Sequence, residues 1–199
     1  MERPVRATVF VLCALPFAWL FYRAVYGGLG PDPGEALMHA TGEWSLRILA
    51  MTLVISPLRV WTGKPWVIKL RRMLGLYAFF YATVHFTLFL QFYTGWTVAT
   101  LLQELAERPY VSAGFAAWLI MLPLAITSTR SMRRRLGQRW ITLHRQVYAA
   151  AIIACLHLLW QARSDIGEPL AYLLVFVLLL AWRVRRAIKH KSNMKPGRV

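Results

Sequence analysis

Three histidines lie inside long apolar stretches of the sequence. His85 occurs in YAFFYATVHFTLFL, and His144 and His157 both occur in RWITLHRQVYAAAIIACLHLLW. An ionisable side chain in an apolar segment of membrane length is costly, so it is a functional candidate by default. These stretches contain no Asp or Glu that could form a proton or cation relay with the histidines. Neutral imidazoles in a dry helical bundle can instead ligate a metal, and haem iron held between helices is the chemistry that this pattern indicates most directly.

Small residues precede two of these histidines at helical spacing. Ala82 and Ala78 lie about one and two turns before His85, and the run AAAIIA precedes His157 in the same way. Such residues would leave room for a flat macrocycle on the face that carries the ligand. Alanines are also ordinary close-packing residues in membrane helices, and a histidine there can simply be hydrogen-bonded to a neighbouring helix. Both interpretations stay open.

The spacing of His144 and His157 places them at different depths. They are 13 residues apart, which is a rise of about 19–20 Å along a helix. On an ideal helix they would also point roughly 140° apart. The pair therefore predicts an inner and an outer position, and the spacing alone does not establish two stacked haems.

The other two histidines carry weaker predictions. His190 lies in the basic segment KHKSNMK, which is expected to be solvated and without a chemical role. His39 lies in HATG, just before an apolar segment. Three roles stay open for it, namely an ordinary loop residue, a partner of a haem propionate, or a ligand.

Six apolar segments must position these residues. The chain is 58% hydrophobic and its mean hydropathy is +0.45, too apolar for a soluble domain of this size. Each segment approaches the ~20 residues that a membrane-spanning helix needs. We therefore expect an all-α polytopic bundle that forms one transmembrane domain over residues 1–199, with a basic tail at 185–199. The expected spans are residues 7–26, 44–61, 74–93, 111–127, 140–160 and 169–184.

The charge distribution argues against nucleic-acid binding, although the net charge is +16. The cations gather in alternate connections, such as TGKPWVIKLRR and STRSMRRRLGQR, and in the tail. Most acids fall in the remaining connections, for example QELAERPY. This is the positive-inside pattern, so the excess charge is interpreted as topological and both termini are expected to be cytoplasmic. The expected partners include membrane lipid and no nucleic acid.

Several stretches together resemble a known family. GGLGPDP, HATG, ISPLR, RRMLGLYAFFYATVHF, ERPY, TSTRSMRRRLGQRWITLHRQVY and CLHLLW are similar to the haem-binding membrane subunits of bacterial periplasmic methionine-sulfoxide reductase systems. These subunits belong to the ferric-reductase-like transmembrane group. The resemblance covers nearly the whole chain, and its LGxRWxxLHxxVY stretch is specific.

The resemblance implies an electron carrier of the bacterial inner membrane with haem b, one or two per chain, and FMN. Its electrons would come from quinol or from a cytosolic flavin reductase. They would pass to a periplasmic molybdopterin-containing methionine-sulfoxide reductase of the MsrP type, which repairs oxidised proteins. Reduction of the sulfoxide is expected in that partner, so whether this chain is itself an enzyme stays open.

The resemblance also implies the haem ligands, which are His85, His144 and His157. Related oxidases carry two histidines on span three, whereas this sequence has only His85 there and Arg71 at the position of the other. By depth, His85 is expected to pair with His157. His144 then lacks an evident histidine partner, so the number of haems stays open.

No GxGxxG fingerprint for a dinucleotide occurs in the sequence, so electrons are expected to arrive from a separate molecule. Arg71 and Arg72 are candidates to bind a haem propionate or the FMN phosphate, although both could simply set topology. The main alternative function is a membrane haem-handling protein or transporter that uses the same histidines.

Overall fold

The structure, a computed structural model, describes residues 2–162 and 166–193. The regular secondary structure of these residues consists of helices, without strands. Six helical segments among them are long and apolar enough to cross a membrane, which confirms the predicted all-α bundle of six spans. The segments are α1 (Glu2–Tyr26), α2 (Pro33–Thr62), η1–α3–η2 (Pro65–Lys69, Leu70–Phe89 and Leu90–Thr94), α5 (Pro109–Ile126), α7–α8 (Gln138–His144 and Val147–Gln161) and α9 (Gly167–Asn193).

Two connections contain short helices that the sequence pattern did not reveal. α4 (Val98–Glu107) lies between the third and fourth spans, and α6 (Arg130–Leu136) lies between the fourth and fifth. Thr129 caps the start of α6, and its side chain accepts a hydrogen bond from the Met132 amide at 3.2 Å. Such a cap satisfies an amide of the first helical turn, which otherwise has no partner.

Helix α2 begins earlier than predicted. The sequence predicts the span over residues 44–61, whereas residues 33–43 already belong to this helix. Asp32 caps it by accepting a hydrogen bond from the Glu35 amide at 2.9 Å, and Pro33 occupies the first turn, where no amide donor is needed. The helix ends at Gly63, which has φ of 65° and so provides a left-handed cap. His39 is therefore a helical residue.

The fifth span is interrupted, whereas the sequence suggested one continuous helix over 140–160. Arg145 and Gln146 separate α7 from α8. The Gln146 amide donates to the Leu143 carbonyl, and the Tyr148 amide donates to the Arg145 carbonyl, so the chain tightens locally to i→i−3 bonds. The tighter turn changes the rotation between His144 and His157, and the angle calculated for an ideal helix does not apply.

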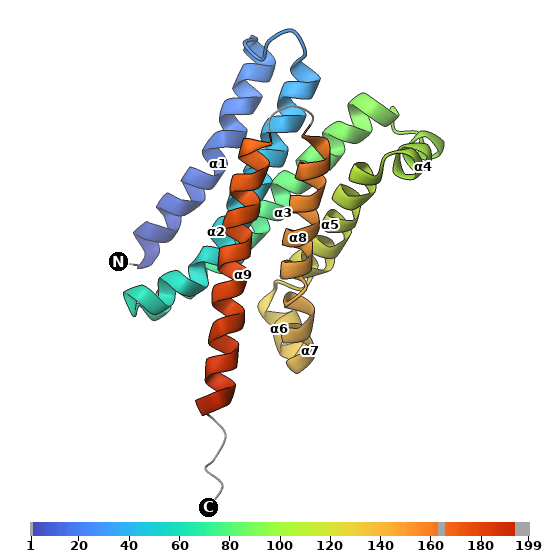
Figure 1. The fold of residues 1–199 in the computed structure, drawn as a ribbon. Helices are drawn as coiled ribbons and strands as arrows, with labels where there is room; N and C mark the ends of the chain where they lie inside the picture. Colours follow the sequence, from blue (N-terminus) through green and yellow to red (C-terminus); the bar gives the residue numbers. More distant parts are fainter. Residues whose placement is uncertain (1, 163–165, 194–199) are drawn as a thin grey trace, which may run out of the picture.

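Two helix pairs form the centre of the bundle, α2 with α3 and α5 with α8. α3 also contacts α5, which joins the pairs, while α1 packs against α2 and α3, and α9 against α2 and α8. Figure 1 shows that α1 begins and α9 ends at the same end of the bundle as α6 and α7. We call this the basic end, because Arg133, Arg134 and Arg135 lie on α6. The opposite end, with Asp32, Glu35, Glu104, Glu107 and Glu168, is called the acidic end.

Tyr81 on α3 is inserted into the backbone of α1. Its hydroxyl donates to the Cys13 carbonyl at 2.8 Å and accepts from the Phe17 amide at 2.9 Å. In a regular helix that amide and that carbonyl would bond to each other. Pro16 lies between them, inside α1, where a proline disturbs the helix. The completely buried hydroxyl of Tyr81 thus repairs α1 and fastens it to α3.

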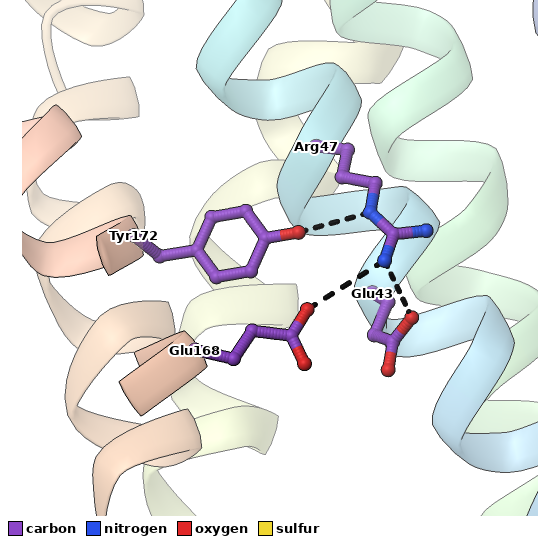
Figure 2. Close-up of polar contacts among 4 residues, drawn as sticks. All are labelled: Glu43, Arg47, Glu168 and Tyr172. Atoms are coloured by element: carbon purple, nitrogen blue, oxygen red, sulfur yellow. Dashed lines mark hydrogen bonds and ion pairs between the residues drawn. The ribbon is translucent and has the colours of Figure 1, made fainter. Parts of the chain in front are cut away.

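A polar cluster fastens α9 to α2 near the acidic end, as Figure 2 shows. The Arg47 Nε–H donates to the Tyr172 hydroxyl at 2.9 Å, and its Nη2 lies 2.8 Å from Glu43 and 3.6 Å from Glu168. The guanidinium also lies over the Trp44 ring, 5.1 Å from its centre. Arg47 therefore has both carboxylates and an aromatic face to balance its charge inside a membrane span.

Candidate functional site

Two of the three predicted ligands come together between the helices. His85 lies on α3 and His157 on α8, and their ring centres are 6.2 Å apart with an angle of 76° between the planes. Both side chains are half-buried. An imidazole nitrogen bonds a transition-metal ion at about 2 Å, so this separation leaves room for one metal ion between the two rings.

The two histidines are held in the same way by neighbouring helices. His85 Nδ1 is 2.8 Å from the Met38 carbonyl oxygen on α2, and His157 Nδ1 is 2.7 Å from the Tyr110 carbonyl oxygen on α5. A carbonyl oxygen can only accept, so each Nδ1 must carry the proton and donate it. Each neutral ring therefore keeps its lone pair on Nε2, the form in which histidine ligates metal.

Two glycines give the imidazoles their space. A Cβ added at Gly42 on α2 would lie 3.0 Å from His85 Nδ1, and one added at Gly114 on α5 would lie 2.9 Å from His157 Nδ1 and Cε1. Any larger residue would displace the rings. Each ring is thus approached at Nδ1 by a carbonyl and by a glycine one turn later, both supplied by the same neighbouring helix.

This pair fits the axial positions of haem better than it fits a metal ion alone. Among the described residues no group of three or more His, Cys, Asp and Glu could hold a metal ion. Structural zinc sites need four protein ligands and catalytic ones three. Haem needs only axial ligands, because the macrocycle itself occupies the remaining positions of the iron. Two imidazoles that keep Nε2 as an acceptor, one on α3 and one on α8 with ring centres 6.2 Å apart, fit that need.

Two of the alanines near the pair take part in helix packing. Ala78 and Ala150 are completely buried and belong to the hydrophobic core. The Ala78 carbonyl also accepts a hydrogen bond from Ser45 on α2 at 2.9 Å. These residues therefore permit close helix packing, and the space at the rings comes from Gly42 and Gly114 instead.

The third predicted ligand, His144, lies toward the basic end, apart from the pair. Its Nε2 is 3.0 Å from the Thr127 hydroxyl, which donates its own proton to the Pro123 carbonyl at 2.6 Å. His144 must then be the donor, which leaves the lone pair on Nδ1. The ring stacks on Trp140, with centres 3.9 Å apart. Among the described ring contacts, histidine pairs with histidine only at His85 and His157.

The predicted arginines occupy the same end as His144. Arg71 is half-buried on α3 and lies close enough to His144 for the two to interact electrostatically. Arg72 is exposed. His39 is also exposed and lies 3.6 Å from the Glu35 carboxylate, one turn earlier on α2. The side chain of His190 lies outside the part of the chain that the structure describes.

The residues that prepare the site include several that side-chain chemistry does not reveal. Met38 and Tyr110 act through backbone carbonyls, and Gly42 and Gly114 act through the absence of a side chain. HATG was noted in the sequence, but for His39. The useful residues of that stretch are its glycine, Gly42, and Met38 just before it.

Comparison with known proteins places this site in a family. Residues 41–155, more than half of the chain, match the family described as "Ferric reductase like transmembrane component". The matched segment contains His85 and His144 and ends two residues before His157. The six-span bundle and this match define the class of the protein as a ferric-reductase-like multi-pass membrane protein.

More similar relatives narrow the class. A protein of Xanthomonas axonopodis pv. citri is 47% identical over 178 residues, which cover 88% of this chain and 82% of the relative. A protein of Bordetella pertussis is 44% identical over 182 residues, which cover 90% and 88%. Both bear the name "Protein-methionine-sulfoxide reductase heme-binding subunit MsrQ". This chain therefore belongs to the MsrQ family. No solved structure matches it.

Proposed function

We propose that this chain is a membrane electron carrier that binds haem b through His85 and His157 and serves a methionine-sulfoxide reductase. The observation that carries the proposal is the matched pair of imidazoles, each donating its Nδ1 proton to a backbone carbonyl and keeping Nε2 free. The names of the relatives, which describe heme-binding subunits of such a reductase, support it further.

The residues of the chain bind and orient the group. His85 and His157 would hold it through Nε2, and the hydrogen bonds to the carbonyls of Met38 and Tyr110 keep the two rings fixed in direction. When bound, haem supplies one-electron redox chemistry, with a potential set by its axial ligands and surroundings. We infer no reaction on methionine sulfoxide in this chain, because that chemistry belongs to the partner.

The direction of electron flow follows from the proposed topology. The basic end faces the cytoplasm of the bacterial inner membrane, where quinol or a cytosolic flavin reductase delivers electrons. The acidic end faces the periplasm, where a molybdopterin-containing methionine-sulfoxide reductase docks. The proposal places His85 and His157 nearer the acidic end, on the side of the acceptor. Arg71, close to His144 at the basic end, and exposed Arg72 are proposed to bind the phosphate of FMN or a propionate.

A spectrum of the purified membrane protein tests the proposed function. The electron-carrier reading predicts bound haem b that is reduced by a quinol or by flavin plus flavin reductase, and reoxidised when the sulfoxide reductase and its substrate are added. Haem that is lost on dilution, without electron transfer, would favour a haem-handling protein. A colourless protein from cells with ample haem would refute both readings.

The binding of FMN and the binding of a second haem at His144 need separate measurements. Haem and flavin per chain, determined on the same preparation, distinguish one haem from two. His144→Ala is expected to remove part of the haem absorbance if His144 holds a second haem. It is expected to leave the absorbance unchanged if the protein binds a single haem, at His85 and His157. Flavin that stays bound through gel filtration in the wild type, and is lost from Arg71→Gln, would support the FMN assignment.

A further inference from the structure

A cavity at the basic end is lined by three arginines. It has a volume of about 530 Å³, which is within the range of ligand pockets. Arg59 from the end of α2 and Arg183 and Arg186 from α9 line it, together with Ser56. The cavity lies where the second and sixth spans reach their last residues, Thr62 and Arg186. This is the depth at which the headgroups of lipids begin.

Two of the arginines are already held in position. The Arg183 guanidinium donates to the Ser56 hydroxyl and lies over the Tyr148 ring, 4.8 Å from its centre. The Arg186 guanidinium lies over the Trp182 ring at 5.4 Å. Such contacts fix the planar guanidinium and leave other N–H donors available, because an arginine has five. Preorganised donors bind an anion with less loss of side-chain entropy.

The cavity contains positive charge without a described counter-charge. Within the described part of the chain, the carboxylates that form ion pairs do so with His39, Arg47 and Arg108, none of which lines the cavity. Arg71 lies close enough to Arg183 to repel it and adds to the positive field. Arg183 and Arg71 are half-buried, and partly buried cations close together near a membrane are expensive unless an anion balances them.

The positive-inside rule does not require such a pocket. Exposed arginines such as Arg134 and Arg135 on α6 satisfy that rule without any cavity around them. Arg59, Arg183 and Arg186 differ because they converge from two helices on one hollow, which also has apolar walls at Val60 and Ile68. Basic pockets between membrane helices on the cytoplasmic side are binding sites for phosphate-bearing headgroups.

We propose that the cavity between the ends of α2 and α9 is a phosphate-binding site, occupied by the headgroup of an anionic phospholipid. The phosphate would lie among the three guanidinium groups, and the glycerol and first acyl carbons would lie against Val60 and Ile68. Because the lipid joins α2 to α9, it would brace the basic end, as the Arg47 cluster does at the acidic end. The site does not depend on haem binding.

The test compares the retention of lipid by the full wild-type chain with its retention by two double variants. The protein is placed in nanodiscs of phosphatidylcholine with a minor share of phosphatidylglycerol, and lipids that remain bound after gentle detergent release are identified by native mass spectrometry. We expect one phosphatidylglycerol per wild-type chain. Arg59→Gln with Arg186→Gln should lower this retention by roughly fivefold for each arginine removed. Both side chains are exposed, so the fold should survive, and a thermal melt verifies it.

Arg134→Gln with Arg135→Gln is the matched control, because it removes the same charge from the same end outside the cavity. Retention equal to that of the wild type is expected there. A second arm adds FMN to nanodiscs of phosphatidylcholine alone and measures the quenching of its fluorescence. If FMN binding is lost only in the Arg59/Arg186 variant, the phosphate site stands and its source is a free monoester. The proposal would be overturned if the Arg59/Arg186 variant kept both phosphatidylglycerol and FMN as well as the wild type does. It would also be overturned if the wild type retained neither phosphatidylglycerol nor FMN.

Discussion

Met38 and Tyr110 control the histidines through their backbone oxygens. Each carbonyl accepts the Nδ1 proton of one ring, and this places both rings in the tautomer that can ligate metal. The arrangement also orients the rings, because a hydrogen bond at 2.7–2.8 Å permits little rotation. A histidine with only a structural role would need one ring nitrogen in a hydrogen bond. Each of these two histidines has that bond at Nδ1 and also keeps Nε2 as an acceptor, with the two ring centres 6.2 Å apart.

Gly42 and Gly114 give the first test at this scale. Alanine at either position would place a methyl group about 3 Å from an imidazole ring, and such overpacking costs roughly 1–3 kcal/mol. Alanine also gains up to about 1 kcal/mol of helix propensity, so overall stability should change little. We expect haem content to fall severalfold in Gly42→Ala and Gly114→Ala, measured as Soret absorbance per chain.

Gly75→Ala serves as the control for these variants. It lies in α3, the helix of His85, but its added methyl group would meet only Thr52 at an ordinary 3.8 Å. Haem content should equal that of the wild type, with stability unchanged or slightly raised. If Gly42→Ala and Gly114→Ala bind haem as well as Gly75→Ala does, the histidine rings do not lie where the structure places them in the haem-bound protein.

At the scale of helices, Tyr81 on α3 replaces a backbone hydrogen bond that α1 lacks near Pro16. Pro16 lacks the amide that a helix interior requires, and Tyr81 supplies a hydroxyl to the neighbouring amide and carbonyl. We expect Tyr81→Phe to destabilise the protein by roughly 1–3 kcal/mol, because it leaves a buried amide and carbonyl without partners. Amide exchange at Phe17 should accelerate. Unfolding in detergent and hydrogen exchange measure the two effects.

Tyr77→Phe is the natural comparison, since Tyr77 lies one turn earlier on α3 and bonds a single α1 carbonyl, that of Phe10, at 3.1 Å in an exposed setting. Its loss should cost much less. Equal effects of the two variants would mean that Tyr81 contributes only an ordinary surface bond. In that case Pro16 would be accommodated by α1 alone.

The sequence predicted the helices better than their ends and interruptions. Apolar length indicated all six spans, because a membrane requires about 20 apolar residues whatever the fold. The Asp32 cap at the start of α2 and the tightened turn at Arg145 depend on individual hydrogen bonds, which composition does not record. For the site, the sequence identified His85 and His157, whereas their partners act through the backbone and became visible only in three dimensions.

For the whole molecule, charge asymmetry is the main determinant of orientation. The basic end carries α6 with its arginines, and the acidic end carries α4 with Glu104 and Glu107. The positive-inside rule then predicts a cytoplasmic basic end. Alkaline phosphatase inserted into the α1–α2 connection at residues 27–32 should be active. The same enzyme fused to the C-terminus should be inactive, whereas a fluorescent protein there should fluoresce. The reverse pattern would invert the proposed direction of electron flow.

The most direct test of the central claim is the haem spectrum of His85→Ala, His157→Ala and the double variant, with His39→Ala as the control. Two ligands of one haem act as a unit, so each single variant should lose the Soret absorbance of that haem entirely. The double variant should lose no more than either single one, and His39→Ala should match the wild type. A full wild-type spectrum in either single variant, or additive losses in the double variant, would contradict the account.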